Sequence, residues 1–172
     1  MDSILLTGPK HAGKTSVGRE LAWLSGVNFT DLDELVEQQT GKTPRALYKE
    51  CPERFRRAEA QALEYLLADI QERIVAAGGG IVDNETALNL LKKAETIRIV
   101  YLEVSPETAW NRILAAGPLP PFLDTPNPRE THERLHQRRG AAYKALAHIT
   151  IPAEAGDPAA LAQHIAAALR RP

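Results

Sequence analysis

The sequence has one cysteine, no long apolar run and almost no net charge. With Cys51 alone, an internal disulfide framework and a zinc site built from several cysteines are both excluded. No apolar stretch approaches the roughly 20 residues of a membrane-spanning helix. The apolar run Ile4–Leu6 is also too short for the core of a signal peptide. We therefore expect a cytoplasmic protein that does not enter a membrane.

Positive and negative charges balance over the whole chain. There are 21 lysine and arginine residues and 22 aspartate and glutamate residues, which gives a formal net charge of -1. This balance produces no overall field that favours nucleic acid or an anionic membrane, so we expect small molecules as partners and no nucleic acid. The length of 172 residues and the share of 44% hydrophobic residues are those of an ordinary globular protein. We expect a single domain over residues 1–172, acting as a monomer.

A glycine-rich stretch near the start reads Gly8-Pro9-Lys10-His11-Ala12-Gly13-Lys14-Thr15. It has the pattern of a phosphate-binding loop, whose backbone N–H groups converge on phosphate oxygens and whose lysine reaches the β- and γ-phosphates. A strand-like apolar run precedes it, and apolar residues at helical spacing follow it, as such a loop requires. We predict that ATP is bound by Gly8, Lys10, His11, Ala12, Gly13, Lys14, Thr15 and Ser16.

Strand-like and helix-like stretches alternate along the chain. Short apolar runs typical of buried strands fall at residues 4–6, 27–30, 73–77, 96–102 and 148–151, with helical patterns between them. The alternation predicts an α/β fold in three layers, with a parallel five-stranded sheet between two layers of helices. Ligands of such sheets gather at the carboxyl ends of the strands. The phosphate loop, Asp31 with Asp33, and Gly78–Gly80 each follow a strand, so we expect them to share one crevice.

The stretch from Gly117 to Pro128 contains five of the twelve prolines. No helix or central strand tolerates that density, so we predict a loop, and a loop of about twelve residues in a compact domain is typically a functional lid. We place this lid at about residues 117–130. Because proline stiffens it, we expect a rigid flap with hinges near Gly117 and Glu130. A helix rich in basic residues is predicted to follow at 131–147.

Four further motifs follow the phosphate loop. They are Phe29-Thr30-Asp31-Leu32-Asp33, Phe55-Arg56-Arg57-Ala58-Glu59, Gly78-Gly79-Gly80, and Arg139 followed four residues later by Tyr143. In this order, and over nearly the whole chain, they resemble the shikimate kinase family of P-loop proteins, within the nucleoside monophosphate kinase group. The resemblance implies transfer of the γ-phosphate of ATP to the 3-hydroxyl of shikimate, with Mg²⁺, on the route to the aromatic amino acids.

The resemblance also implies roles for individual residues, with the shikimate-binding region at about residues 31–62. Lys14 and Asp33 are the expected catalytic residues, because Asp33 would orient the attacking hydroxyl and is the candidate base. Asp31 would contact Mg²⁺ through water, and Thr15 through its hydroxyl. The backbone N–H groups of Gly78, Gly79 and Gly80 would face the shikimate ring.

Three arginines receive roles in the same way. Arg56 and Arg139 would hold the acceptor carboxylate, which a guanidinium can bind through two parallel hydrogen bonds. For Arg56 the alternative is a surface ion pair with Glu53 or Glu59. Arg112 would stack on adenine, and its alternative is an exposed helix position paired with Glu107 or Thr108.

The chain departs from the family at the lid. The family's lid carries an arginine before Pro-Leu-Leu, whereas the comparable stretch here is Leu119-Pro120-Pro121-Phe122-Leu123, and no arginine lies between Arg112 and Arg129. Arg129 or Arg134 could substitute, Lys14 and Mg²⁺ could act alone at a lower rate, or the acceptor could differ from shikimate. We predict substitution by Arg129, because it lies in the segment expected to move.

Two other functions stay open from the sequence. One is a related kinase for another carboxylated polyol, such as quinate or gluconate, with the altered lid reflecting altered specificity. The other is a nucleotide-binding module that has lost turnover. The presence of both Arg56 and Arg139 argues against the module, since a protein without a carboxylate acceptor needs neither.

Overall fold

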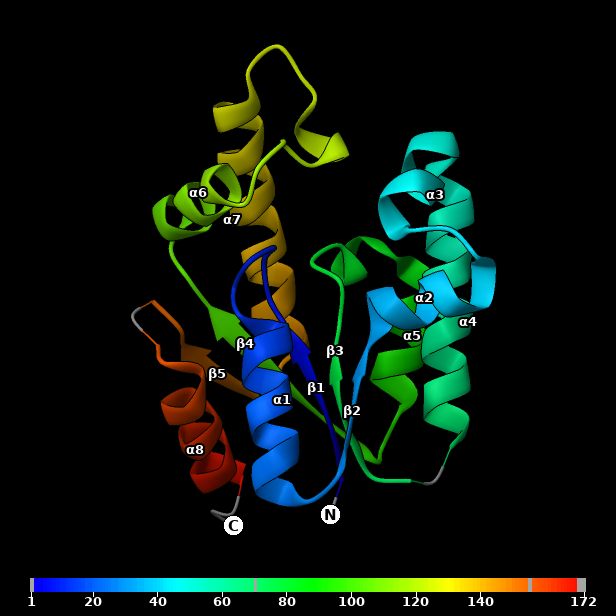
Figure 1. Ribbon diagram of the computed structural model, residues 1–172, viewed down its shortest axis with the longest axis vertical. Helices are drawn as coiled ribbons and strands as arrows, with labels where there is room; N and C mark the ends of the chain where they lie inside the picture. The colour runs from blue at the N-terminus through cyan, green and yellow to red at the C-terminus, as the bar shows by residue number, and fades with distance from the viewer. Residues whose placement is uncertain (1, 70, 155, 170–172) are drawn as a thin grey trace.

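The computed structural model describes residues 2–69, 71–154 and 156–169. Met1 and Pro172, the limits of the predicted domain, lie outside these ranges. The elements follow in the order β1 (Ser3–Thr7), α1 (Lys14–Ser25), β2 (Asn28–Asp31), α2 (Leu32–Thr40), α3 (Pro44–Glu50), α4 (Pro52–Ala68), β3 (Arg73–Ala76), η1 (Ile81–Asp83), α5 (Glu85–Lys93), β4 (Ile97–Glu103), α6 (Pro106–Ala115), η2 (Pro121–Leu123), α7 (Pro128–Leu146), β5 (Ile149–Pro152) and α8 (Pro158–Leu169). Figure 1 shows their arrangement.

The five strands form one parallel sheet in the order β2-β3-β1-β4-β5. β1 lies at its centre, with Leu5 beside Val75 of β3 and Ile99 of β4. Its side chains alternate between the two faces, so Leu5 packs into one core cluster while Ile4 and Leu6 pack into the other. Because both faces of the strands are buried, their sequences are continuous apolar runs. The predicted α/β fold with a parallel five-stranded sheet is confirmed.

Helices cover both faces of the sheet (Figure 1). One face carries α1 and α8, which pack against each other and supply Val17, Leu21 and Ile165 to the core. The other face carries α4, α5 and α7, which supply residues such as Leu63 and Leu91. These are the three layers that the sequence predicts. Among the described residues, no helix has the length and apolar character that crossing a membrane requires.

The connections open a crevice at the carboxyl ends of β1 and β3. The two strands are neighbours in the sheet. The chain continues from the end of β1 to α1 on one face of the sheet, and from the end of β3 to α5 on the other face. Where connections diverge in this way, the strand ends leave room for a ligand. The phosphate loop after β1 and the triple glycine after β3 therefore face the same space.

Capping side chains fix where the helices near this crevice begin. Asp31 caps α2 by accepting a hydrogen bond from the Asp33 backbone N–H at 3.0 Å. Thr43 caps α3 in the same manner, with Pro44 in the first turn. Ser105 caps α6, and Pro106 follows it in the first turn. The cap at Asp31 also holds the backbone of Asp33 at the start of α2.

The lid connects α6 to α7 and spans residues 116–127 (Figure 1, top). It contains the short turn η2, whose Leu123 is completely buried. α7 begins at Pro128, three residues before the predicted start at Thr131, because proline in the first turn of a helix loses no hydrogen bond. The loop between the helices therefore ends at Asn127, and Arg129 belongs to α7.

Candidate active site

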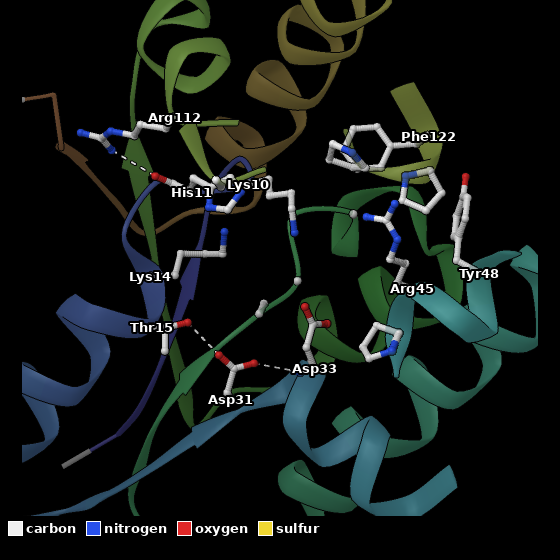
Figure 2. Close-up of a pocket in the computed structure, with 18 of the residues that line it drawn as sticks. Lys10, His11, Lys14, Thr15, Asp31, Asp33, Arg45, Tyr48, Arg112 and Phe122 are labelled. Carbon is white, nitrogen blue, oxygen red and sulfur yellow. Dashed lines mark hydrogen bonds between the residues drawn. The ribbon is translucent and has the colours of Figure 1, made fainter. Parts of the chain in front are cut away.

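A cavity of about 760 Å³ lies at the carboxyl ends of the strands. Residues from the phosphate loop, from the ends of β2 and β3, from α3 and α4, and from the lid and α7 line it (Figure 2). We call the part lined by Lys10, His11, Gly13–Ser16 and Arg112 the phosphate end. The acceptor end is the part lined by Asp33, Arg45, Tyr48, Glu59, Gly78–Gly80 and Arg139. The three strand-end clusters thus share one crevice, as predicted.

The phosphate loop wraps closely around Lys14. Gly8 has a φ of 145°, and a Cβ atom on it would lie 2.6 Å from the Leu102 carbonyl oxygen, so only glycine fits there. The Lys14 ammonium donates to the carbonyl oxygens of Gly8 at 2.9 Å and Pro9 at 2.7 Å. Burial lowers the pKa of Lys14 to about 8, opposed by the charge of Asp33. At neutral pH the lysine therefore keeps its proton in most molecules.

The other residues of the phosphate loop differ in whether they face the cavity. Lys10, His11, Gly13, Thr15 and Ser16 line the cavity, while Ala12 is buried behind the loop. Figure 2 shows the Lys10 side chain reaching into the space between Lys14 and the acceptor end. Burial lowers the pKa of His11, and the neighbouring Lys10 charge lowers it further, so this imidazole stays neutral.

Thr15 and Asp31 form a pair of oxygen groups beneath the loop. The Thr15 hydroxyl donates to Asp31 Oδ2 at 2.7 Å, and Asp31 Oδ1 is held by the α2 cap. Hydroxyl and carboxylate oxygens suit Mg²⁺. No group of three or more His, Cys, Asp or Glu side chains that could hold a metal occurs within the described parts of the chain. An ion at this pair would take most of its ligands from phosphate and water, which is usual for Mg²⁺.

Two carboxyl groups are buried at the acceptor end. Asp33 Oδ1 and Glu59 Oε1 are buried without a hydrogen-bond partner among the described residues. Burial raises the pKa of Asp33, and the charge of Asp31 adds to this, against Lys14 and Lys10. Burial raises the pKa of Glu59 to about 7, although Asn84 donates to its Oε2 at 2.9 Å. Each group therefore has one buried acceptor atom that no described residue satisfies.

Arg139 and Tyr143 extend from one face of α7 toward the triple glycine. Arg139 lines the cavity, and its Nε donates to Asp83 Oδ2 at 2.8 Å. Its guanidinium carbon lies 5.2 Å from the ring centroid of Phe122 in the lid. The buried Tyr143 hydroxyl donates to the Gly79 carbonyl oxygen. Because Arg139 and Tyr143 are four residues apart on α7, they lie on the same side of the helix. Tyr143 holds the glycine segment, and Arg139 places its positive charge beside it.

Arg112 joins α6 to the phosphate loop. Its Nη1 donates to the His11 carbonyl oxygen at 3.1 Å, and its Nη2 donates to the carbonyl oxygens of Ala153 and Glu154. It lines the cavity (Figure 2), whereas the alternative pairing with Glu107 or Thr108 does not occur.

Three arginines to which the sequence analysis gave a role do not line the cavity. Arg56 is 42% exposed, and its Nη1 lies 3.9 Å from Glu53 Oε1, the predicted alternative. Arg129 forms ion pairs with Glu107 and Glu133 and lies over the Trp110 ring at 5.3 Å. Arg134 faces Glu130 at 3.8 Å.

Sequence reasoning missed several residues of the acceptor end. Arg45, Tyr48 and Phe55 line it, and Glu59 does so although we treated it only as part of a motif. Tyr48 lies four residues after Pro44 and three after Arg45 on the short helix α3, and both spacings bring side chains together on a helix. The edge of the Tyr48 ring meets Phe55 of α4, with centroids 6.1 Å apart. The helical spacing on α3 was the available signal.

Comparisons with known proteins agree on one family. The sequence model of the family described as shikimate kinase matches residues 10–170. The shikimate kinase of Marinomonas sp. (strain MWYL1) is 32% identical, covering 98% of this chain and 92% of its own. That of Paracidovorax citrulli (strain AAC00-1) is 35% identical, covering 95% of this chain and 90% of its own.

Solved structures give the same result for the fold. The shikimate kinase from Acinetobacter baumannii in complex with shikimate superposes with a TM-score of 0.89 at 32% identity, covering 98% of this chain and 93% of that one. The shikimate kinase from Aquifex aeolicus superposes with a TM-score of 0.80 at 25% identity, covering 97% and 95%.

Proposed function

This chain belongs to the shikimate kinase family, and we propose that it transfers the γ-phosphate of ATP to the 3-hydroxyl of shikimate. It is an ATP-dependent phosphotransferase of the shikimate pathway, as the family membership implies. The single observation that best supports this acceptor is the pair of unpartnered buried oxygens on Asp33 and Glu59, beside the Arg139 guanidinium. A ring with hydroxyls and one carboxylate satisfies all three groups.

Asp33 is the proposed base for the attacking hydroxyl. Its unpartnered Oδ1 can accept a hydrogen bond from the attacking hydroxyl. Burial raises the pKa of this carboxyl group toward the range in which a general base works best. The charges of Lys14 and Lys10 oppose this rise in the pKa of Asp33. Orienting the hydroxyl toward the phosphate is the larger part of the effect, because phosphoryl transfer depends mainly on positioning and charge.

The acceptor carboxylate is proposed to lie against Arg139, with Arg56 as a second contact and with the backbone N–H groups of Gly78–Gly80 facing the ring. Arg139 already lines the cavity. Arg56 must turn away from Glu53, and a 3.9 Å contact between exposed groups is too weak to prevent this.

The nucleotide is proposed to lie along the loop, with its phosphates over Lys14 and the start of α1 and its adenine near Arg112. The positive end of the helix dipole favours the anion at this place. Thr15 and Asp31 would hold Mg²⁺, which when bound neutralises charge on the phosphate oxygens. The lid excludes water from the transfer, since hydrolysis of ATP would otherwise compete. Arg129 keeps its predicted catalytic role only if the start of α7 moves toward the cavity.

We further propose that the chain acts as one domain, as a monomer and in the cytoplasm. These proposals rest on its length, its balanced charge and the absence of a long apolar run in its sequence.

A second acceptor class is favoured by one feature, the lid without an arginine. A related kinase for quinate or gluconate would share the carboxylate and the hydroxyls but present them differently to the lid. An assay of ADP release with ATP and shikimate, quinate or gluconate separates the two. We expect turnover with shikimate to exceed turnover with the other acids. Turnover only with another acid supports the second class, and binding of ATP without turnover on any acid contradicts a kinase function.

A further inference from the structure

The lid of this protein offers no cation to a bound ligand. Residues 113–128 contain neither lysine nor arginine. A carboxylate enclosed under such a lid loses its hydration, and the loss is large unless cations pair with it. The positive charge at the acceptor end must therefore come from other elements.

Two arginines line the acceptor end, Arg45 and Arg139. Arg139 is already paired, because its Nε donates to Asp83 Oδ2 at 2.8 Å and its Nη2 lies 2.6 Å from the same oxygen. Asp83 also accepts from Arg138, so its single negative charge is shared between two arginines. Arg139 can still contact an anion, but only while it shares its charge with Asp83.

Arg45 differs because it faces no carboxylate within ion-pair distance among the described residues. It is exposed, and it is the second residue of α3, a helix with no acidic residue in its first turn. A cation at this end of a helix opposes the helix dipole, so the arginine does not serve to stabilise α3. Its charge is available to a ligand.

The Arg45 side chain contacts the lid. The guanidinium Nη2 donates to the Leu119 carbonyl oxygen at 3.2 Å, the one hydrogen bond that this side chain makes within the described residues. Figure 2 shows the guanidinium entering the cavity between Asp33 and Phe122. Nε and Nη1 remain to bind an anion. The lid, which contains no lysine or arginine, thus orients the guanidinium of Arg45.

We propose that Arg45 binds the acceptor carboxylate from the lid side and links that contact to closure of the lid through Leu119. This inference rests on the proposed function, and it specifies which residue recognises the acid group. An acceptor carboxylate bridging Arg45 and Arg139 would bring α3, the lid and α7 together. Closure would then depend on a negatively charged acceptor.

The test compares shikimate with its methyl ester, which lacks the charge, in the parent, Arg45→Ala and Arg45→Lys. We expect Arg45→Ala to raise the KM for shikimate about tenfold or more, as loss of a charge-assisted hydrogen bond does. The KM for ATP and the KM for the ester should change less than about twofold, because neither ligand offers a carboxylate. Arg45→Lys should recover part of the loss. Arg54→Ala is the matched control, since Arg54 is an exposed arginine paired with Glu50 outside the cavity.

The proposal is overturned if Arg45→Ala leaves the KM for shikimate within about twofold of the parent, or raises the KM for acid and ester by the same factor. A parent protein that fails to phosphorylate shikimate overturns the proposed function instead. If that parent turns over quinate or gluconate, the same comparison of acid and ester on that substrate decides the role of Arg45.

Discussion

Asp33 and Glu59 direct their unpaired carboxyl oxygens at the same small space beside Gly78. A Cβ atom on Gly78 would lie 3.0 Å from Asp33 Oδ1 and 3.1 Å from Glu59 Oε1. Asp33 stands in the first turn of α2 and Glu59 in the middle of α4, so two separate helices converge on this point. Because Gly78 has no side chain, both buried carboxyl groups can pack directly against its backbone.

Substitution of Gly78 by alanine should therefore impair use of the acceptor. The added methyl group would require both carboxyl groups to shift by a few tenths of an ångström, and a shift of that size at a reacting group lowers activity about tenfold, less than the roughly 100-fold of a full 1 Å misplacement. We expect kcat/KM for shikimate to fall about tenfold while the KM for ATP stays within about twofold. Gly140→Ala is the control, because its Cβ would meet only the Tyr101 hydroxyl at 3.9 Å. Equal kinetics of Gly78→Ala and parent would show that the space is not used.

Protonation of Glu59 should make stability depend on pH. Burial raises the pKa of Glu59 from 4.5 to about 7, so above pH 4.5 the unfolded state binds fewer protons than the folded state. The stabilisation is complete below about pH 4.5 and is lost as the pH rises to about 7, with an upper limit near 3 kcal/mol. Glu59→Gln should remove this decline. Urea unfolding of both proteins at several pH values between 4.5 and 7.5 measures it, and parallel pH profiles would contradict it.

Arg129 and Arg134 were the predicted substitutes for the lid arginine. If Arg129 reaches the transferred phosphate, Arg129→Ala should lower kcat by orders of magnitude, as loss of a transition-state arginine does. Arg134→Ala is the matched comparison, because Arg134 is more exposed and its contact with Glu130 is longer. Steady-state kinetics of both variants with saturating ATP and shikimate decide the matter. Losses under about threefold in both variants leave Lys10, Lys14 and Arg112 as the cations at the phosphate end.

Thr15 and Asp31 should govern the response to Mg²⁺. Removal of Mg²⁺ with EDTA should abolish activity, and its readdition should restore it. Thr15→Ala and Asp31→Asn should each raise the Mg²⁺ concentration for half-maximal activity about tenfold or more, since groups that position metal ligands typically contribute this much. Glu34→Gln, an exposed change in α2, should leave it unchanged. An unaltered Mg²⁺ response in both site variants would place the ion elsewhere.

The sequence predicted most of the fold because its signals are local. Buried parallel strands appear as short apolar runs, and the runs containing Leu5, Val75 and Ile99 pair in the sheet. The start of α7 was missed because Pro128 was counted with the lid prolines, although a proline at that helix position is well tolerated.

The candidate site was predictable only where a motif lies in one segment. Asp33, the triple glycine and Arg139 were found in this way, and all of them line the cavity. The contact of Arg45 with Leu119 joins residues 74 positions apart, and no local sequence pattern predicts it. The burial of Glu59 likewise depends on Asn84, 25 positions away. Such contacts follow from tertiary packing, which the spacing of residues does not encode.

The most direct test of the central claim is to follow the phosphorus atoms of ATP by ³¹P NMR in the presence of the protein, Mg²⁺ and shikimate. We predict that the γ-phosphate signal is replaced by one phosphomonoester signal coupled to the proton on C3 of the ring, in step with ADP. Asp33→Asn should form this product far more slowly, because Asp33 orients the attacking hydroxyl. Appearance of inorganic phosphate alone, or of an ester at another ring position, would contradict transfer to the 3-hydroxyl.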